Sequence, residues 1–462
     1  MSVEESRQGA AWTLKQRLLS GGAWTAGARI VAGLSGFAVN ALLSRLMPPE
    51  DFGAYLLLVS FASVGAMMAQ LGLQLAIVRL ITEAIAQGNG PRARGFIRMA
   101  FRAVTIAAIA LGILLVVVGA DGAVSVFHSA MLAHVAWLGG AWLVGLALMN
   151  LVAESFRGLH DYRMAGAMGG AGSTLLLLVA LVLVFMMQGR ADLFLVALLG
   201  CLAVFSCVAA GATLLRRRAI QLGPARAVPV SELLAVSLPL LVTGVAIFIS
   251  TQADLWIIGI YRVKEEVATY GAAVRLVQLV IMPMLMMNAV LAPSISEQFS
   301  QGHHARLERL LRGCAALVGL PALMALALIV FSASPVLGWV YGDFYRSGAT
   351  ALLLVSAGQV VNVLSGSGAV VLMMTGHQRS AMAISAATGA GLVVGALLVV
   401  ERYGISGVAA VAGTMTALHG LAAAARVRRA TGMKTYCSLN SIADVAVGLH
   451  RHLRGNLRGR NA

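Results

Sequence analysis

Long apolar stretches dominate the chain, and short polar segments separate them. A search for apolar runs of about 20 residues, the length that crosses a bilayer as a helix, predicts twelve membrane spans. The predicted spans are residues 22–45, 53–78, 99–120, 131–154, 164–188, 192–215, 233–260, 267–292, 311–334, 349–374, 380–400 and 404–425. Backbone polar groups in lipid must be satisfied within the segment, so these spans are expected to be helices. The predicted fold class is therefore all-α, a polytopic membrane protein with twelve transmembrane helices.

The positions of the basic residues predict the orientation of the spans. Cytoplasmic loops of membrane proteins are enriched in Lys and Arg. With the N-terminus inside, most of the 34 Lys and Arg residues fall in inner loops and in the two terminal segments. An even number of spans then places both termini in the cytoplasm. A missed span would exchange the sides of all later loops, so the charge pattern supports the count.

Composition excludes several classes of function. The chain is 59% hydrophobic and 11% charged, whereas a soluble domain carries about 25% charged residues. The net charge of +16 is spread over short loops and does not form one basic face, so no nucleic-acid partner is expected. Loops within the bundle are too short for a soluble catalytic domain, and motifs for ATP hydrolysis and metal-dependent hydrolysis are missing. We therefore expect neither an enzyme nor a cofactor.

Two short motifs occur twice along the chain. EDFGAY at 50–55 resembles EEVATY at 265–270, each in a predicted outer turn that leads into a span. GLHDYR at 158–163 resembles TGHQR at 375–379, each in a predicted inner loop. Both pairs are separated by nearly the same length of chain, which predicts a repeat of six spans. Because six is even, both copies enter the membrane from the same side.

This repeat predicts the domain organisation. We expect an N-terminal six-helix lobe at 1–218, a C-terminal six-helix lobe at 219–428 and a basic cytoplasmic tail at 429–462. The tail segment SIADVAVGLHRHLRG is compatible with an amphipathic helix on the anionic inner leaflet. A frayed basic end is the alternative for the same segment.

Ionisable residues inside spans are the first candidates for a functional site, because they are costly in hydrocarbon and usually face a cavity or a partner. Arg275 and Asp254 lie at comparable depths in neighbouring predicted spans. Either they form a buried ion pair that joins the spans, or Arg275 contacts an anionic substrate. Arg29 has the same two alternatives, with Glu154 as its candidate partner. Asp254 and Glu154 are thus candidates for ion coupling or for structural pairs.

Neutral polar side chains inside spans form a second group of candidates. Nine amides lie within spans: Asn40, Gln70, Gln74, Asn150, Gln252, Gln278, Asn288, Gln359 and Asn362. Each alone is expected to bond to a neighbouring helix, but together they exceed what packing needs. Amides suit sugar hydroxyls, and a guanidinium suits a phosphate. The predicted substrate-binding residues are Arg29, Arg275, Asn40, Gln70, Gln74, Gln278, Asn288, Gln359 and Asn362. The SGSG sequence at 365–368 is expected to break its span.

Five stretches of the chain resemble bacterial polysaccharide flippases of the Wzx type, in the multidrug, oligosaccharidyl-lipid and polysaccharide (MOP) exporter superfamily. They are RLMPPEDFGAYLLLVSFASVGAMMAQLGLQLAIVR, SLPLLVTGVAIFISTQADLWIIGIY, VATYGAAVRLVQLV, MTGHQRSAMAIS and GISGVAAVAGTMTA. Each motif is loose, but their order and spacing together are fairly specific to this group. The resemblance extends from about residue 15 to about residue 428 and leaves out the tail.

The resemblance implies two six-helix lobes around a cavity that is often cationic. It implies transport of an undecaprenyl-pyrophosphate-linked oligosaccharide across the bacterial inner membrane, for O-antigen, capsule or exopolysaccharide assembly. It also implies coupling to an H⁺ or Na⁺ gradient in some members. The implied partners are the lipid-linked oligosaccharide, membrane lipids and polysaccharide polymerase or assembly proteins. Arg29 or Arg275 would then contact pyrophosphate or acidic sugar, and the amides would contact hydroxyls.

Two other functions remain as alternatives. A cation-coupled drug or metabolite exporter of the same superfamily would have a cavity richer in acids and aromatic residues, whereas aromatic residues make up only 6% of this chain. A membrane glycosyltransferase or polymerase is more distant, because that class generally needs catalytic groups in a sizeable outer loop. The predicted outer loops here are short.

Overall fold

The computed structural model describes residues 27–125, 129–231 and 252–433, together with the single residues 24, 127, 233, 237, 241 and 435. Every regular element within these residues is a helix, which confirms the predicted all-α class. The chain folds into two compact units. Unit 1 comprises Met1–Gln252 with Val263–Ala268, and unit 2 comprises Ala253–Arg262 with Thr269–Ala462.

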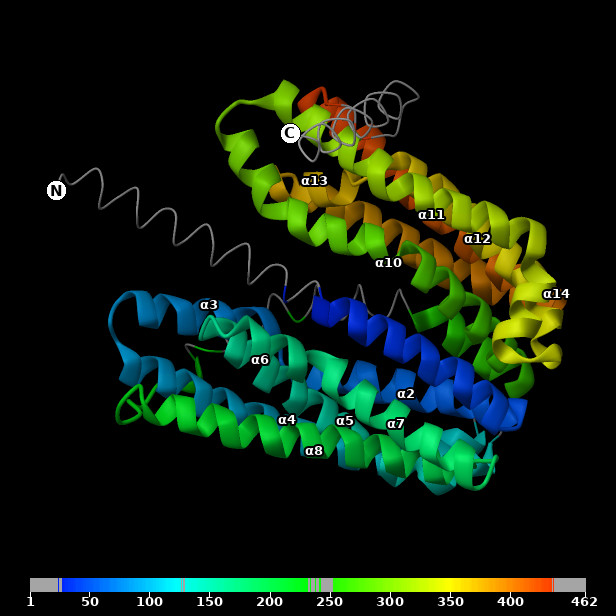
Figure 1. Ribbon diagram of the computed structural model, residues 1–462, viewed down its shortest axis with the longest axis horizontal. Coiled ribbons are helices and arrows are strands. Elements are labelled where there is room, and N and C mark those ends of the chain that lie inside the picture. Colours follow the sequence, from blue (N-terminus) through cyan, green and yellow to red (C-terminus); the bar gives the residue numbers. More distant parts are fainter. Residues whose placement is uncertain are drawn as a thin grey trace, which may run out of the picture. The chain divides into compact units, whose positions relative to one another are not determined.

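Unit 1 is a helical bundle centred on α5. Its first helix covers Gly27–Leu46. The later helices are α2 (Pro49–Ala69), α3 (Leu73–Ala86), α4 (Gly90–Ser125), α5 (Ala130–Gly158), α6 (Tyr162–Gly166), the π-helical turn Ala167–Ala171, α7 (Gly172–Met187) and α8 (Leu193–Ile220). Helix α5 packs against α2, α3, α4 and α8 (Figure 1). A helix with neighbours on so many sides is apolar around most of its circumference, as the sequence of α5 is.

Capping residues define where several helices of unit 1 begin. A Ser or Asp side chain placed before the first turn accepts a hydrogen bond from a backbone N–H that has no partner within the helix. Three helices begin in this way, with bonds from Leu132 N to Ser129 Oγ (3.3 Å), from Met164 N to Asp161 Oδ1 (3.2 Å) and from Leu195 N to Asp192 Oδ1 (2.9 Å). Helix α2 begins with a proline at its first position, Pro49, which needs no N–H partner there.

Unit 2 is a second helical bundle. Its helices are α10 (Lys264–Ser300, whose first turn belongs to unit 1), α11 (His304–Tyr341), the 3₁₀ turn Asp343–Gly348, α12 (Ala349–Ser365), α13 (Gly368–Met374) and α14 (Gln378–Thr431). Helix α12 packs against α11 and α14, and α13 packs against α14. Where α12 meets α14, a Cβ on Gly358 would overlap the backbone of Gly413. The two backbones therefore touch, as small residues allow in membrane helix pairs.

Helix α14 consists of two antiparallel halves. Gly404 has a positive φ of 57° and ψ of −145°, which interrupts the helix near its middle. Across the turn, a Cβ on Gly395 would lie 2.7 Å from Val411, and Thr388 Oγ1 lies 3.4 Å from His419 Nδ1. The two predicted spans 380–400 and 404–425 correspond to these halves, so the position of the turn between them was predicted correctly.

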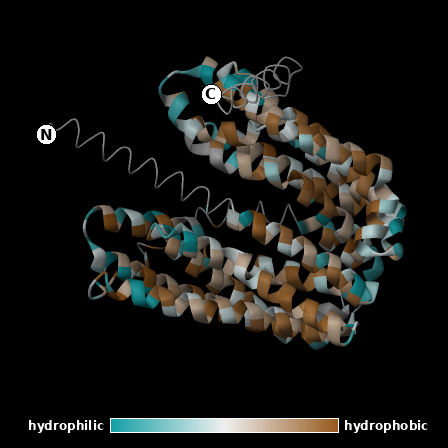
Figure 2. Ribbon diagram, in the orientation of Figure 1, coloured by the Kyte–Doolittle hydropathy of each residue, from teal (hydrophilic) through white to brown (hydrophobic). Residues whose placement is uncertain are grey.

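The described residues contain ten helices long and apolar enough to cross a membrane. In Figure 2, apolar residues cover most of the length of these helices and hydrophilic residues gather towards their ends. The chain is thus a multi-pass membrane protein. The number twelve stays a prediction, since the predicted span 233–260 lies largely outside the described residues.

Three further predictions lie wholly or partly outside the described residues. None of residues 1–23 and only 429–433 and 435 of the tail 429–462 are described, so the cytoplasmic placement of both termini and the amphipathic tail helix stay predictions. The boundary between lobes at 218 and 219 also stays a prediction, because most residues from 232 to 251 are not described.

Two predicted spans are interrupted, and the expectation of one continuous helix in each was wrong. The predicted span 53–78 is broken after α2, where Leu71 and Gly72 have positive φ values of 52° and 74°. The predicted span 164–188 is broken at the π-helical turn, where Gly170 has a φ of 104°. Apolar periodicity continues through both breaks, which is why the pattern of hydrophobic residues does not reveal them.

The first copy of the outer motif contacts the beginning of α10, which carries the second copy. EDFGAY lies in the first turns of α2, and EEVATY lies in the first turns of α10. A Cβ on Gly53 would overlap the carbonyl group of Lys264, so glycine is required for this contact. The first turn of α10 therefore belongs to unit 1, while the helix continues in unit 2 from Thr269.

The two copies of the inner motif adopt similar turns. His160 in GLHDYR has a φ of 61°, and Gly376 in TGHQR has a φ of 83°. The next residue in each copy, Asp161 or His377, is the N-cap of the following helix. The sequence repeat thus corresponds to a repeat of local backbone conformation.

Candidate functional site

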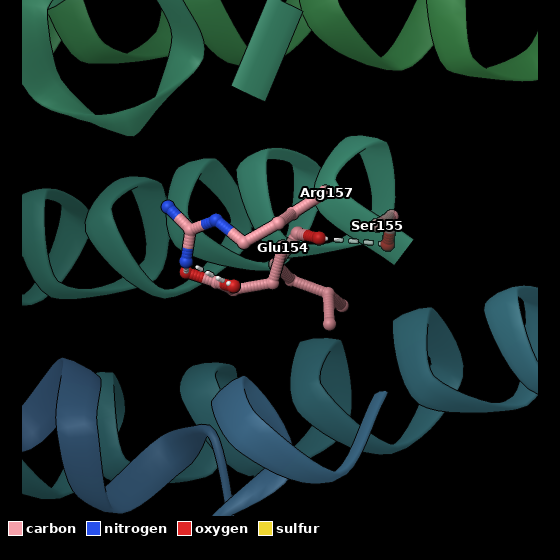
Figure 3. A network of polar contacts seen from close by, with 4 residues as sticks. Glu154, Ser155 and Arg157 are labelled. Atoms are coloured by element: carbon pink, nitrogen blue, oxygen red, sulfur yellow. Dashed lines mark hydrogen bonds and ion pairs between the residues drawn. The ribbon is translucent and has the colours of Figure 1, made fainter. Parts of the chain in front are cut away.

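In unit 1, Glu154 forms an ion pair with a neighbouring arginine of its own helix and not with Arg29. Both carboxylate oxygens of Glu154 accept hydrogen bonds from Arg157 Nη1, at 2.6 Å each (Figure 3). Arg157 lies one turn further along α5, so this ion pair forms within a single helix. Arg29 acts on Glu154 only over a longer distance. Within the described residues, no acidic side chain forms an ion pair with Arg29, and its side chain is exposed.

Hydroxyl groups join the first helix of unit 1 to the break in the predicted span 164–188. Ser35 Oγ lies 3.0 Å from Thr174 Oγ1 on α7. Thr174 Oγ1 donates to the carbonyl oxygen of Gly170 at 2.8 Å, at the non-helical turn. These hydroxyls bond to the backbone beside the interruption, which is how polar groups stabilise broken helices in membranes.

Asn40 and Gln70 are predicted substrate-binding residues of unit 1, and each has an oxygen without a partner. Asn40 Nδ2 donates to Gly36 O at 2.7 Å, whereas its Oδ1 is buried and accepts no hydrogen bond. Gln70, only 2% exposed, donates from Nε2 to Ala66 O at 3.2 Å and leaves its Oε1 equally unsatisfied. Buried acceptors of this kind cost free energy until a donor reaches them.

The break after α2 separates the two predicted glutamines Gln70 and Gln74. Gln70 is the C-cap of α2, and Gln74 is half-buried in the first turn of α3. The left-handed residues Leu71 and Gly72 lie between them. The structure therefore puts Gln70 at the end of α2 and Gln74 on α3, whereas the sequence predicted one continuous helix for both.

In unit 2, the side chain that forms a hydrogen bond with Asp254 is a tyrosine and not the predicted Arg275. Tyr270 Oη donates to Asp254 Oδ2 at 2.6 Å, and the backbone N–H of Leu255 donates to Oδ1 at 2.8 Å. Tyr270 is 1% exposed. Arg275 acts on Asp254 electrostatically, but no ion pair within 4.0 Å joins these two described residues.

Arg275 is half-buried, and its hydrogen bond to a neighbouring glutamine is long. Its Nη1 lies 3.5 Å from Oε1 of Gln278, one turn along α10. Gln278 is exposed. Both residues are predicted to bind substrate. The structure places the guanidinium of Arg275 and the amide of Gln278 next to each other on α10.

The remaining predicted amides lie close to the SGSG break, which the structure confirms between Ser365 and Gly368. Ser367 Oγ donates to Oδ1 of Asn288 on α10. Asn362 Nδ2 donates to Oε1 of Gln359, one turn away on α12, at 3.1 Å. Asn288 thus bonds to the residue inside the break, and the other two amides lie within two turns before it.

Sequence reasoning missed several polar groups that the structure brings together. Tyr270, Ser35, Thr174 and Ser367 all bond to the predicted residues or stabilise the breaks. A signal was present for two of them, because glycine pairs in AMGGAGS and SGSG mark places where a helix is readily interrupted. Among the described residues, no cluster of three His, Cys, Asp or Glu side chains could hold a metal ion.

Comparison with known proteins gives a family and a fold. The sequence profile of a family described as polysaccharide biosynthesis protein matches residues 18–299. No curated protein sequence matches the chain. The solved structures below share the fold of this protein at sequence identities of 12% to 17%.

Three solved structures illustrate this shared fold. One is an inward-facing multidrug resistance transporter of the MATE family (TM-score 0.70, 16% identity, 87% of this chain and 97% of that chain). Another is the lipid II flippase MurJ in an inward closed conformation (TM-score 0.70, 12% identity, 92% and 90%). The third is an outward-facing MATE transporter (TM-score 0.60, 17% identity, 87% and 93%). The fold is therefore that of MOP superfamily transporters.

Proposed function

Because the chain belongs to the polysaccharide biosynthesis protein family and has the fold of a MOP superfamily transporter, we propose that it is a flippase for a lipid-linked oligosaccharide. The substrate class is an undecaprenyl-pyrophosphate-linked glycan, and the membrane is the bacterial inner membrane. The product serves O-antigen, capsule or exopolysaccharide assembly, with polymerase or assembly proteins as downstream partners. Transport of this kind breaks and forms no covalent bond, so the protein needs no catalytic group.

The observation that carries the proposal is the chemistry of the polar groups inside the spans. In unit 2, the side chains at the SGSG break are amides and hydroxyls: Asn288, Gln359, Asn362 and Ser367. Such groups exchange hydrogen bonds with sugar hydroxyls without the desolvation cost of a buried charge. Arg29 and Arg275 add guanidinium groups whose acidic neighbours are held by other residues. A guanidinium suits a pyrophosphate, which offers several acceptor oxygens.

Alternating access is the proposed mechanism. Solved structures of this fold include inward-facing and outward-facing states. In the proposed cycle, the glycan and pyrophosphate bind the polar groups from the inner side, the lobes rock, and the ligand leaves on the outer side while its prenyl chain stays in lipid. Asp254 is the proposed ion-coupling residue for an H⁺ or Na⁺ gradient, because it is a carboxylate inside a predicted span whose bonding partner, Tyr270, is neutral.

A cation-coupled drug or metabolite exporter is the second candidate. The shared fold with multidrug resistance transporters and the carboxylate of Asp254 favour it. The two candidates differ in what the arginines do, because a cationic drug gains nothing from a guanidinium in its binding site.

The test uses a bacterial strain that lacks its own flippase and displays glycan only when this chain transports it. The double variant Arg29→Ala/Arg275→Ala is expected to lose more than nine-tenths of surface glycan at equal membrane level. The control Arg79→Ala/Arg309→Ala removes two exposed arginines, one on α3 and one on α11, and should transport normally. Normal surface glycan in the first variant, or drug resistance without glycan export in the parent chain, would refute the proposal.

A further inference from the structure

One end of unit 1 carries arginines from two distant segments. Helix α4 contributes the basic residues of 90–102, and the end of α8 with its following loop contributes those of 216–226. No acid occurs between Glu83 and Asp121 or between Asp192 and Glu232. Both segments therefore add positive charge without local neutralisation.

Backbone contacts hold the two segments together. Arg226 N donates to Pro91 O at 2.9 Å, and Arg94 Nη1 donates to Gly223 O at 2.6 Å. A Cβ on Gly95 would overlap the carbonyl group of Arg226. Arg226 is thus fixed on the side of α4 that carries Pro91 and Gly95.

The same side of α4 continues with Arg98 and Arg102. Positions seven and eleven residues after Pro91 return to one face of a helix. Beyond Arg102 this face carries exposed apolar side chains, among them Ile106 at 70% and Val117 at 63%. An apolar stripe exposed to this degree on a membrane helix faces lipid chains. The arginines therefore lie where the lipid-facing stripe ends, at the depth of phospholipid head groups.

Some arginines of this region already have partners, whereas three that lie on or against this side of α4 have none for their side chains in the described part of the chain. Arg92 lies over the ring of Phe96 at 5.5 Å, Arg94 bonds to the backbone, and Arg218 lies 3.8 Å from Asp161. Within the described residues, Arg98, Arg102 and Arg226 are exposed and form no ion pair. We call these three residues the α4 arginine face.

We propose that the α4 arginine face binds the phosphate head group of an anionic phospholipid, whose acyl chains lie along the stripe that begins at Ile106. Three guanidiniums at one end and an apolar stripe at the other match an amphipathic anion and not a soluble phosphate. Charge attraction near a membrane surface contributes with each basic residue, and a guanidinium can hold a phosphate through two hydrogen bonds. This site is independent of the proposed transport function.

The test measures lipid binding by the purified full-length chain in detergent. Phosphatidylglycerol and phosphatidylcholine of equal chain length are titrated, with the lipid-bound fraction read by native mass spectrometry and the unfolding temperature as a second readout. Arg98→Gln/Arg102→Gln is expected to weaken phosphatidylglycerol binding about thirtyfold. Each single variant should lose about fivefold, which keeps the test possible if the double variant does not fold. Arg216→Gln/Arg217→Gln, which removes equal charge at the exposed end of α8, should bind as the parent does.

The outcomes separate a lipid site from general charge attraction. Preference for phosphatidylglycerol that is lost only in the Arg98 and Arg102 variants supports the proposal. Equal loss in the Arg216 and Arg217 control would overturn it, as would an unchanged affinity in all variants. An equal rise in unfolding temperature with soluble glycerol phosphate would overturn it as well, because the acyl chains would then contribute nothing.

Discussion

Unit 1 and unit 2 each contain a carboxylate and an arginine inside predicted spans, but they hold the carboxylate in different ways. In unit 1, Glu154 pairs with Arg157 one turn away on the same helix. In unit 2, Asp254 accepts a hydrogen bond from Tyr270, sixteen residues away on another helix. The first arrangement forms when α5 forms, whereas the second requires the fold.

The two arrangements have the same consequence for the arginines. Arg29 and Arg275 are each left without a carboxylate at ion-pair distance among the described residues. A buried ion pair would have held them in place at a desolvation cost. In each unit, the acidic neighbour of the arginine bonds to another side chain, as the proposed function requires of a guanidinium that binds a ligand.

The largest expected effect tests how closely helices approach in the two units. Gly358→Ala in unit 2 places a methyl group against the backbone of Gly413, so α12 and α14 must separate. We expect a loss of about 3 kcal/mol in the free energy of unfolding, measured in detergent by thermal unfolding. Gly36→Ala in unit 1 is the matched control, because no atom lies within 4 Å of the added Cβ. Equal destabilisation of both variants would contradict the backbone contact.

The next effect concerns the tertiary hydrogen bond of unit 2. Tyr270→Phe removes the hydroxyl that donates to Asp254 at 2.6 Å. A buried acceptor left without its donor costs about 2 kcal/mol, so the free energy of unfolding should fall by that amount. Tyr403→Phe, at an exposed tyrosine of the same unit, should leave the unfolding temperature unchanged. An unchanged stability of the Tyr270 variant would show that Asp254 does not depend on the hydroxyl.

The smallest effect on stability concerns the local ion pair of unit 1. Arg157→Gln frees both oxygens of Glu154, and the partly exposed pair contributes only about 1 kcal/mol or less. If the proposed function is correct, transport should fall much more than stability, because Glu154 can then attract Arg29. Surface glycan at equal protein level and the unfolding temperature are both measured. Arg79→Gln, which breaks the exposed pair with Glu83, should change neither quantity.

Much of the helical architecture follows from the sequence pattern. Long apolar runs predicted membrane helices, and the turn near Gly404 between the last two predicted spans was placed correctly. The SGSG break was also predicted, because glycine and serine interrupt a helix locally. The breaks at Leu71 and Gly170 were not predicted, since apolar residues continue on both sides of them.

The hydrogen-bond and ion-pair partners of the candidate residues were harder to predict from the sequence. Depth along a span suggested that Asp254 and Arg275 are neighbours, and they do interact electrostatically. Depth does not determine which way a side chain points around its helix, so the hydroxyl of Tyr270 was not anticipated as the closer partner. The spacing of three residues between Glu154 and Arg157 is compatible with an ion pair within one helix, but Arg29 was named as the candidate partner from the sequence.

The sequence by itself determined that this protein is a helical membrane protein, because a continuous apolar run of about 20 residues in lipid satisfies its backbone within the segment as a helix. It also determined the family, through residues 18–299. Only the tertiary structure decided which polar groups meet, since that depends on helix rotation, on breaks such as the one at Gly170 and on contacts such as Gly358 with Gly413. These contacts join residues far apart along the chain, and apolar periodicity carries no information about them.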